Sequence, residues 1–259
     1  MTQTGAGDTL AAKVTVHGVG KTFWRRDEPL VVLQDIELSV QAGELVCLLG
    51  PSGCGKTTLL NIVGGFDVPT VGTVEIDGQP VRGPDPRRVF VFQEYGIFPW
   101  ATVWENVGLG LRKRPTDEQH RIIRHYVDLV GLTGFEGTYP AELSGGMKQR
   151  VAVARALAVS PDIIFMDEPL GALDSLTRLQ MRGELLRIRQ QEQPTILFVT
   201  HDVDEALQLA DRIVVMTPRP GRIAEIVPVP MSHPRDLGSP EYGRTKNGLL
   251  DVLGVGHAV

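Results

Sequence analysis

Residues 44–58 decide the fold and have the sequence Glu-Leu-Val-Cys-Leu-Leu-Gly-Pro-Ser-Gly-Cys-Gly-Lys-Thr-Thr. The first half of this stretch is almost continuously apolar, which is typical of a strand that is buried on both faces. The strand leads into a glycine-rich turn, and the residues from Thr57 to Gly64 have a helical pattern. A buried strand, a glycine-rich turn and a helix in this order predict one unit of a mostly parallel sheet with helix-covered faces.

The glycine-rich turn, Gly50-Pro-Ser-Gly-Cys-Gly-Lys56-Thr57, fits the phosphate-binding P-loop pattern. Glycines allow backbone N–H groups to turn inward around phosphate oxygens, and the N-terminus of the following helix adds partial positive charge. Lys56 would supply a point charge to the β- and γ-phosphates, and Thr57 would supply a hydroxyl ligand for Mg²⁺. The alternative is a glycine-rich turn with an exposed lysine, which the flanking strand and helix make the weaker interpretation.

The rest of the chain alternates between strand-like and helix-like patterns, which indicates an α/β protein. We expect short antiparallel strands within 13–40 and further strands at 71–77, 89–92, 162–166, 195–200 and 212–216. We expect helices at 118–130 and 202–210, and two more from the spacing of two apolar sets: Met147, Val151, Ala154 and Ala158, and Leu176, Leu179, Gly183 and Leu186. From Pro218 onward, prolines and polar residues predict an extended arm.

The composition excludes several classes of protein. The chain has 259 residues, of which 42% are hydrophobic and 22% charged, so it has enough apolar surface to fold and is not a disordered chain. A net charge of −5 argues against bulk attraction to nucleic acid or anionic lipid. Two cysteines without metal-ligand spacing fit a reducing compartment. Without a long apolar run or a signal peptide, we expect a soluble cytoplasmic protein that other chains would hold at a membrane.

A second motif is the apolar segment Ile163-Ile-Phe-Met-Asp167-Glu168, which ends in two adjacent carboxylates. In P-loop enzymes an aspartate at such a strand end holds the Mg²⁺ shell. Side chains alternate along a strand, so Glu168 can point elsewhere and is a candidate to orient or deprotonate the attacking water. On its own, the motif is an ordinary exit from a strand into a loop, and its combination with the P-loop favours the catalytic interpretation.

A third motif, Leu143-Ser-Gly-Gly-Met-Lys-Gln149, precedes a predicted helix. Ser144 is a good N-cap, and the adjacent glycines leave N–H groups open, so this helix end could bind a second phosphate group. The alternative is that the motif has only a structural role, as the capped start of a helix after a proline-containing loop. Because the P-loop already encloses one side of a phosphate site, we expect a second copy of the chain to bring this helix end to it.

Together these motifs resemble the ATP-binding subunit of ABC transporters. Residues 143–149 resemble the signature motif of that family, and residues 50–57 and 163–168 resemble its Walker A and Walker B motifs. Four further positions match the glutamine of the Q-loop, the D-loop, the switch histidine and the adenine-stacking aromatic residue, where phenylalanine replaces the more common tyrosine: Gln93, Asp174, His201 and Phe23. The resemblance covers about residues 13–230.

The resemblance implies a dimer in which two ATP molecules lie between the P-loop of one copy and the signature helix of the other. The implied nucleotide-binding residues are Phe23, Gly50, Pro51, Ser52, Gly53, Cys54, Gly55, Lys56, Thr57, Thr58, Ser144, Gly145, Gly146, Gln149 and Asp174. The implied Mg²⁺ residues are Thr57, Gln93 and Asp167, and the implied catalytic residues are Glu168, His201 and Gln93. Glu168 would polarise water, and His201 would contact the γ-phosphate.

The resemblance also implies a division into domains. An ABC ATP-binding domain would span 13–245, with a P-loop NTPase core at about 13–93 and 161–230 that includes an N-terminal antiparallel β part. A helical subdomain would occupy about 94–160, and a C-terminal arm would occupy 231–259.

Two segments resemble the nitrate/sulfonate/taurine importer branch: Val91-Phe-Gln-Glu-Tyr-Gly-Ile-Phe-Pro-Trp100 and Val215-Met-Thr-Pro-Arg-Pro-Gly-Arg222. This resemblance implies import of a small anion, powered from the cytoplasmic face of the inner membrane. Membrane permease subunits would dock near residues 93–100, an extracytoplasmic substrate-binding protein would be an indirect partner, and no nucleic acid would bind. The aromatic cluster Phe98-Pro99-Trp100 has an alternative explanation as packing between lobes.

Three other functions compete with this one. An ATPase of another importer branch would share every motif. A non-transport ABC ATPase would usually carry two modules or a long coiled-coil insertion, and a P-loop kinase would not need residues 143–149. The transported compound is not set by any residue of this chain, because in this family other subunits select it.

Two residue types outside the main motifs invite separate interpretations. Cys54 lies within the P-loop, where it is either a small residue that matters for its backbone or an oxidation-sensitive thiol with a pKa lowered by the helix N-terminus. The remaining histidines lack ligand spacing, and we predict surface positions for all of them: His17, His120, His125, His233 and His257.

Overall fold

The computed structural model of the chain describes residues 12–92 and 94–255. Three of our predictions concern positions outside this description: frayed residues in 1–11, the Q-loop residue Gln93, and the mobile end at 256–259. No helix in the described ranges is long and apolar enough to cross a membrane.

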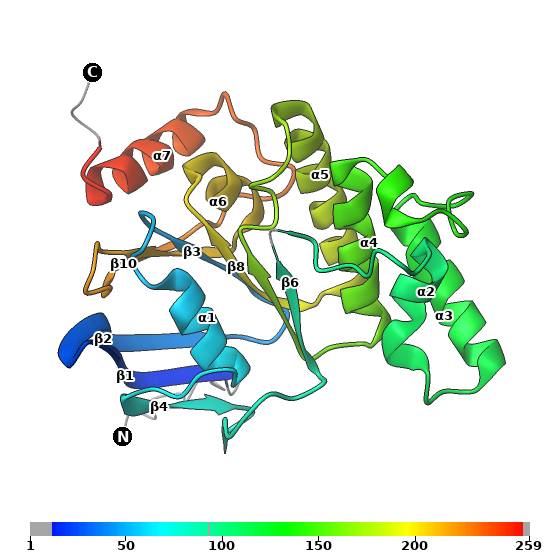
Figure 1. The fold of residues 1–259 in the computed structure, drawn as a ribbon. Helices are drawn as coiled ribbons and strands as arrows, with labels where there is room; N and C mark the ends of the chain where they lie inside the picture. The colour runs from blue at the N-terminus through cyan, green and yellow to red at the C-terminus, as the bar shows by residue number, and fades with distance from the viewer. Residues whose placement is uncertain (1–11, 93, 256–259) are drawn as a thin grey trace, which may run out of the picture.

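A six-stranded sheet forms the centre of the molecule, in the order β10-β9-β3-β8-β7-β6 (Figure 1). Its strands are β3 (Leu45–Leu49), β6 (Arg88–Phe92), β7 (Ile163–Asp167), β8 (Thr195–Thr200), β9 (Arg212–Met216) and β10 (Ile223–Pro228). All neighbours pair in parallel except β9 and β10, which are antiparallel. The carboxyl ends of five parallel strands therefore meet at one edge, where ligands bind in open α/β sheets.

A second, antiparallel sheet has the order β2-β1-β4-β5. It consists of β1 (Val14–Arg25), β2 (Glu28–Val40), β4 (Val71–Ile76) and β5 (Gln79–Pro80). Our expectation of short strands in this region was wrong, because β1 and β2 form one long hairpin that pairs from Val14 with Val40 to Arg25 with Glu28. The outer half of the hairpin is exposed and mixes charged residues with exposed hydrophobic ones such as Trp24 and Val31, so it lacks the regular alternation on which strand prediction relies.

Helices cover both faces of the central sheet. They are α1 (Lys56–Gly64), α2 (Val103–Gly108), α3 (Thr116–Leu129), α4 (Gly145–Ala158), α5 (Ser175–Glu192), α6 (Val203–Leu209) and α7 (Pro240–Val252), with short 3₁₀ helices at Leu109–Leu111 and Pro140–Glu142. Helix α1 lies between the two sheets, and α2, α3 and α4 group beside the β6 edge (Figure 1). The fold class is therefore the one the sequence predicted, whereas the domain bounds at 94–160 and 231–259 stay predictions.

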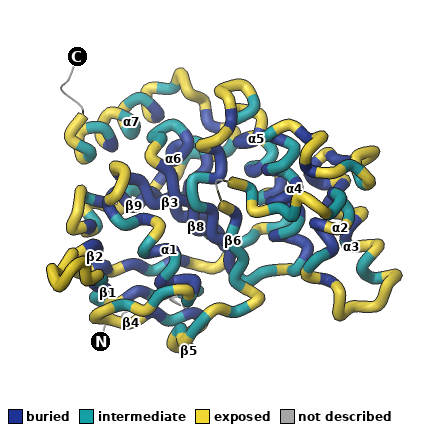
Figure 2. The backbone as a smooth tube through the Cα atoms, viewed as in Figure 1, coloured by how far each residue is buried: buried dark blue, intermediate teal, exposed yellow. Residues whose placement is uncertain are grey.

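The central sheet separates two hydrophobic cores. Val46 and Leu48 of β3 pack with α1 and the antiparallel sheet, whereas Cys47 and Leu49 pack into the core under α4, α5 and α6. Every residue of β3 is buried, which confirms the strand predicted before the P-loop. The tube in Figure 2 shows these central strands as the most continuously buried part of the chain. Their rigidity fixes where the P-loop and the other strand-end residues lie.

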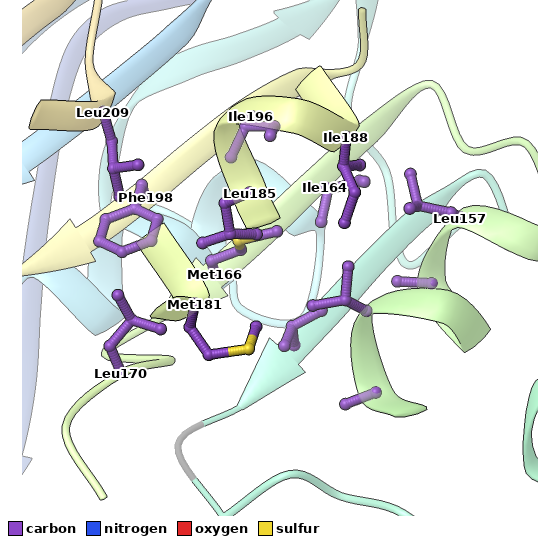
Figure 3. Packing of buried hydrophobic residues seen from close by; sticks show 14 of the residues in the cluster. Leu157, Ile164, Met166, Leu170, Met181, Leu185, Ile188, Ile196, Phe198 and Leu209 are labelled. Carbon is purple, nitrogen blue, oxygen red and sulfur yellow. The ribbon is translucent and has the colours of Figure 1, made fainter. Parts of the chain in front are cut away.

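Helix α5 is present, but its buried face differs from the one we predicted. Leu176 and Leu179 are 66% and 54% exposed, whereas Met181, Leu185 and Ile188 are buried. Figure 3 shows these last three side chains directed at residues of β7 and β8. The sequence of α5 offers two overlapping apolar stripes, and the position of the sheet selects between them. Helix α4 differs in another way, because it is buried almost all round rather than on one face.

The segment after residue 218 is not the extended arm that we predicted. Strand β10 pairs with β9, and α7 begins at an N-cap, Ser239, whose side chain accepts a hydrogen bond from the Tyr242 N–H at 3.2 Å. A serine followed by Pro240 at the first helical position is a helix-start signal that the proline content of the segment obscured. Tyr242 and Leu249, seven residues apart, are the buried residues of this helix.

Candidate functional site

The P-loop wraps around the ammonium group of Lys56. Lys56 is only 5% exposed, and its Nζ donates hydrogen bonds to the carbonyl oxygens of Gly50 at 2.7 Å and Pro51 at 3.0 Å. Gly53 and Gly55 have φ values of 76° and 106°, a region that glycine adopts readily. A Cβ at Gly55 would also lie 2.6 Å from the side chain of Leu33. The loop therefore holds a positive charge at the N-terminus of α1, as a phosphate site requires.

Thr57 and Asp167 meet at the mouth of the P-loop. The Thr57 hydroxyl donates a hydrogen bond to Asp167 Oδ1 at 3.1 Å. Burial raises the pKa of Asp167, and the Thr57 hydrogen bond and Lys56 only partly oppose this shift. A hydroxyl beside a desolvated carboxylate is an oxygen pair of the kind that Mg²⁺ prefers, so these two residues fit the metal. The third predicted ligand, Gln93, follows Phe92, which pairs with Asp167 in the sheet, and lies outside the described residues.

Glu168 turns away from Thr57 toward the end of β8. Its backbone has a left-handed φ of 46°, and its N–H donates to the carbonyl of Val199 at 3.0 Å. Its Oε2 lies 3.3 Å from Nδ1 of His201. Glu168 is therefore directed at His201, whereas its neighbour Asp167 is directed at Thr57. The two adjacent carboxylates thus have different partners. This arrangement would allow one carboxylate to bind a metal ion while the other acts in proton transfer.

The predicted signature helix end lies at a different surface. Ser144 caps α4 by accepting a hydrogen bond from the Met147 N–H at 3.3 Å. It lines a hollow of about 260 Å³ with Gly146 and Thr177, and no P-loop residue contributes to that lining. A Cβ at Gly146 would lie 2.5 Å from Thr177, so the close contact between α4 and α5 requires glycine at this position. The two helix ends that we predicted to bind phosphate are thus not brought together within one chain.

Two further predicted nucleotide residues have mainly local partners. Asp174 caps α5 by accepting hydrogen bonds from the backbone N–H groups of Leu176 and Thr177. Its hydrogen bonds, above all those involving Thr177, lower the pKa of Asp174. Gln149 is 1% exposed within α4, and its Oε1 has no hydrogen-bond partner in the described residues. The structure therefore shows Asp174 at an accessible helix start and Gln149 inside the helical region.

Phe23 lies on β1 and is 40% exposed, with the Lys21 ammonium 4.8 Å from its ring centroid. Its cross-strand partner Leu30 lines a cavity of about 470 Å³ near the tip of the hairpin. Arg219 lines the same cavity, and a Cβ at Gly53 of the P-loop would lie 3.4 Å from its guanidinium. Our sequence reasoning assigned no role to Arg219. Arg219 follows β9, which lies next to β3 in the sheet, and this position could have predicted that Arg219 lies near the P-loop.

The cysteine and histidine predictions have mixed outcomes. Cys54 is 1% exposed, which gives an oxidant little access to its thiol and favours the interpretation as a small residue. His17, His120 and His125 are exposed as expected, and His257 lies outside the described residues. The prediction for His233 was wrong, because this residue is half-buried, burial lowers the pKa of its ring, and Nε2 has no hydrogen-bond partner in the described part of the chain.

Comparisons with known proteins show the family to which the chain belongs. The family model described as ABC transporter matches residues 33–171. The nitrate import ATP-binding protein NrtD of Synechococcus elongatus is 47% identical over 91% of this chain and 89% of that protein. The bicarbonate transport ATP-binding protein CmpD of a Synechocystis strain is 42% identical over 97% and 93%. The aliphatic sulfonates import ATP-binding protein SsuB of Bacillus anthracis is 41% identical over 92% and 94%.

Solved structures give the same result. A dimeric, post-hydrolysis structure of the ATP-binding cassette MJ0796 bound to ADP and Pi has a TM-score of 0.72 and 33% identity, and the match covers 83% of this chain and 98% of that one. CbiO1 of Clostridium perfringens, with a TM-score of 0.76 and 24% identity over 84% and 89% of the two chains, supports the fold. The chain belongs to the ABC transporter family. Within that family it is an ATPase cassette.

Proposed function

We propose that this cassette powers the import of a small anion of the nitrate, bicarbonate or sulfonate type. The observation that carries the proposal is the 47% identity over 91% of the chain with a nitrate import protein, together with the similarity to bicarbonate and sulfonate proteins. All three relatives serve small, oxygen-rich anions. The choice among these anions belongs to partner subunits, since the sites described above serve the nucleotide.

The separation of the two helix ends supports a working unit of two chains. The P-loop and the Ser144 hollow occupy different surfaces of one copy, so one ATP molecule can contact both only if a second copy supplies the second surface. The dimeric MJ0796 cassette is a precedent for such an assembly. Contacts that form only when the two copies close around ATP would stabilise the transition state more than the bound substrate. Such contacts accelerate hydrolysis.

Within each site, different residues would bind the phosphates, hold Mg²⁺ and activate water. The backbone N–H groups of the P-loop and Lys56 would bind the β- and γ-phosphates, and Thr57 and Asp167 would hold Mg²⁺. The metal, when bound, neutralises charge on the phosphate oxygens. Glu168 would accept a proton from the attacking water or orient that water. His201, 3.3 Å from Glu168, would position this carboxylate and contact the γ-phosphate.

A groove beside α2 fits the predicted permease contact. It has a volume of about 350 Å³ and is lined by Phe98, Trp100, Ala101, Glu105, Leu109 and Arg112. Trp100 is 73% exposed, and its ring centroid lies 5.2 Å from that of Phe98. Asn106 fixes the Phe98 backbone by hydrogen bonds of 2.8 and 3.1 Å. A fixed groove that is lined by aromatic and aliphatic residues and by two charged ones suits a helix of a membrane subunit. The exposure of Trp100 favours this interpretation over packing between lobes.

The decisive experiment is to tag the chain in its native cells, solubilise the membranes gently and identify the proteins that co-purify. We expect a multi-span permease, and loss of the complex on Trp100→Ala. Deleting the gene should abolish uptake of one of the three anions. Recovery with ribosomes or DNA only would instead indicate a non-transport ABC ATPase. Phosphate release in vitro without any acceptor separates either of these ATPases from a P-loop kinase.

A further inference from the structure

The histidine of the site is joined directly to a short helix. His201 lies between the end of β8 and α6, a helix of seven residues. The N-cap of α6 is Asp202, whose side chain accepts hydrogen bonds from the N–H groups of Asp204 at 2.8 Å and Glu205 at 3.0 Å. Because one residue separates His201 from the first turn of α6, a shift of that turn moves the backbone of His201.

Helix α7 contacts this first turn through one carboxylate. Tyr242 donates its hydroxyl hydrogen to Asp204 Oδ1 at 2.9 Å, and Lys246 Nζ lies 2.9 and 2.8 Å from the two carboxylate oxygens. Tyr242 and Lys246 are four residues apart, so they lie on the same face of α7. Three hydrogen bonds from two side chains, one of them charged, fix the Asp204 carboxylate in one position.

The same C-terminal segment holds the other end of α6. Arg235 is 9% exposed, and its guanidinium donates hydrogen bonds to the carbonyls of Leu207 and Ala210, which end α6. It also donates to Val229 and Met231 in the segment that leads to α7. A cation at the C-terminus of a helix satisfies free carbonyls and complements the helix dipole. Residues 229–246 therefore contact α6 at both ends (Figure 1).

Helix α5 contacts the opposite side of the same turn. Arg178 and Arg182 lie 3.5 to 3.8 Å from the carboxylates of Asp202 and Glu205, and Glu205 accepts a hydrogen bond from the Thr200 hydroxyl at 2.7 Å. The turn that follows His201 is thus held between α5 and α7. The ion pairs from α5 are made with Asp202 and Glu205, whereas in the described residues the side-chain hydrogen bonds to the Asp204 carboxylate come from α7.

We propose that Lys246 and Tyr242 are positioning residues for ATP hydrolysis. Through Asp204 they hold the first turn of α6, and through that turn they hold His201 against Glu168. The inference rests on the catalytic role proposed above for His201. It gives α7, which no ATP-binding motif includes, a function in turnover.

The test uses the full chain and steady-state ATP hydrolysis. We expect Lys246→Met to lower kcat about three- to tenfold while KM for ATP changes less than twofold, because small misplacements of a positioned group reduce rate more than binding. Lys246→Arg should restore kcat, and Tyr242→Phe, which removes one hydroxyl, should show a smaller loss. The matched control is Arg244→Met, which removes the same charge from α7 at an exposed side chain with no ion pair in the described residues.

A double-mutant comparison separates positioning from general stability. In a His201→Gln background, Lys246→Met should cause no further loss of the residual turnover, because the residue it positions is absent. An equal loss in both backgrounds, or an equal loss from Arg244→Met, would overturn the inference while leaving the ATPase function intact. Wild-type turnover in His201→Gln alone would instead remove the role of His201, and the inference with it.

Discussion

The two helix ends predicted to bind phosphate are built in opposite ways. Helix α1 begins after Gly55 in a left-handed conformation, without a side-chain cap, and the preceding loop surrounds the Lys56 ammonium. Helix α4 begins at Ser144, whose side chain satisfies the Met147 N–H, and no acidic residue lies in its first turn. The first end brings its own charge and enclosure. The second presents a capped helix start at an open hollow.

This difference indicates that the two helix ends contribute differently to nucleotide binding and to hydrolysis in a pair of chains. An end that carries a buried cation can bind a nucleotide within one chain. An end that offers only hydroxyl and backbone groups contributes little alone and much when a charged ligand is already in place. ATP binding should therefore depend on the α1 end, and turnover should depend on both ends.

The largest expected effect concerns the step that both ends serve. Glu168→Gln keeps the size of the side chain and removes the carboxylate, so turnover should fall about a thousandfold, within the usual range for a general base. ATP affinity should stay within a few-fold, and the ATP-bound variant should accumulate as a dimer on size exclusion. Glu225→Gln, which makes the same change at an exposed carboxylate of β10 outside every motif, serves as a control. Normal turnover of Glu168→Gln would remove this residue from the chemistry.

The next effect isolates the α1 end. Lys56→Ala should weaken ATP binding about a hundredfold, since charge-assisted contacts to phosphate each contribute about 1.5 to 3 kcal/mol. Titration calorimetry of the single chain measures this loss. Lys113→Ala, at an exposed position of the helical region, should bind ATP normally. Equal affinities for Lys56→Ala and the wild type would mean that the backbone of the loop suffices, and the contrast between the helix ends would fail.

A smaller effect should isolate the α4 end. Ser144→Arg places a long side chain in the hollow that a second copy would need, so turnover should fall at least about tenfold while the single chain binds ATP as before. Ser144→Ala separates blocking from capping, because it removes only the N-cap, which contributes about 1 kcal/mol to stability. If Ser144→Arg hydrolyses ATP at the normal rate, the site is complete within one chain.

The smallest effect is a pH dependence of stability at Asp167. Burial raises the pKa of this carboxylate in the folded chain. Above that pKa the ionised carboxylate destabilises the nucleotide-free fold. This loss of stability disappears as the pH falls below about 3.9, the pKa of aspartate in the unfolded chain. Asp167→Asn should therefore melt higher at pH 7, by about 2 to 4 °C for each kcal/mol removed. The difference from the wild type should shrink toward pH 4, and a constant difference would exclude the titration of Asp167 as its cause.

Local sequence was enough to predict the elements whose signals are strong over a short range. The apolar strand before the P-loop, the glycines of the loop and the carboxylates after Met166 each depend on neighbours within a few residues. Parallel strands place their ends at one edge, so the meeting of Thr57 with Asp167 also followed from the order of the elements. The Mg²⁺ and catalytic roles of these residues stay predictions.

Features that depend on residues far apart in the sequence could be recognised only in the folded structure. The outer half of the β1–β2 hairpin forms although its side chains are exposed and lack regular alternation, and α5 buries Met181 rather than Leu179 because the sheet lies on that side. Helix α7 was hidden among prolines, and its contacts with Asp204 join residues 42 positions apart. Burial and ion pairing depend on what the rest of the chain places nearby, and a pattern within one segment carries no information about that.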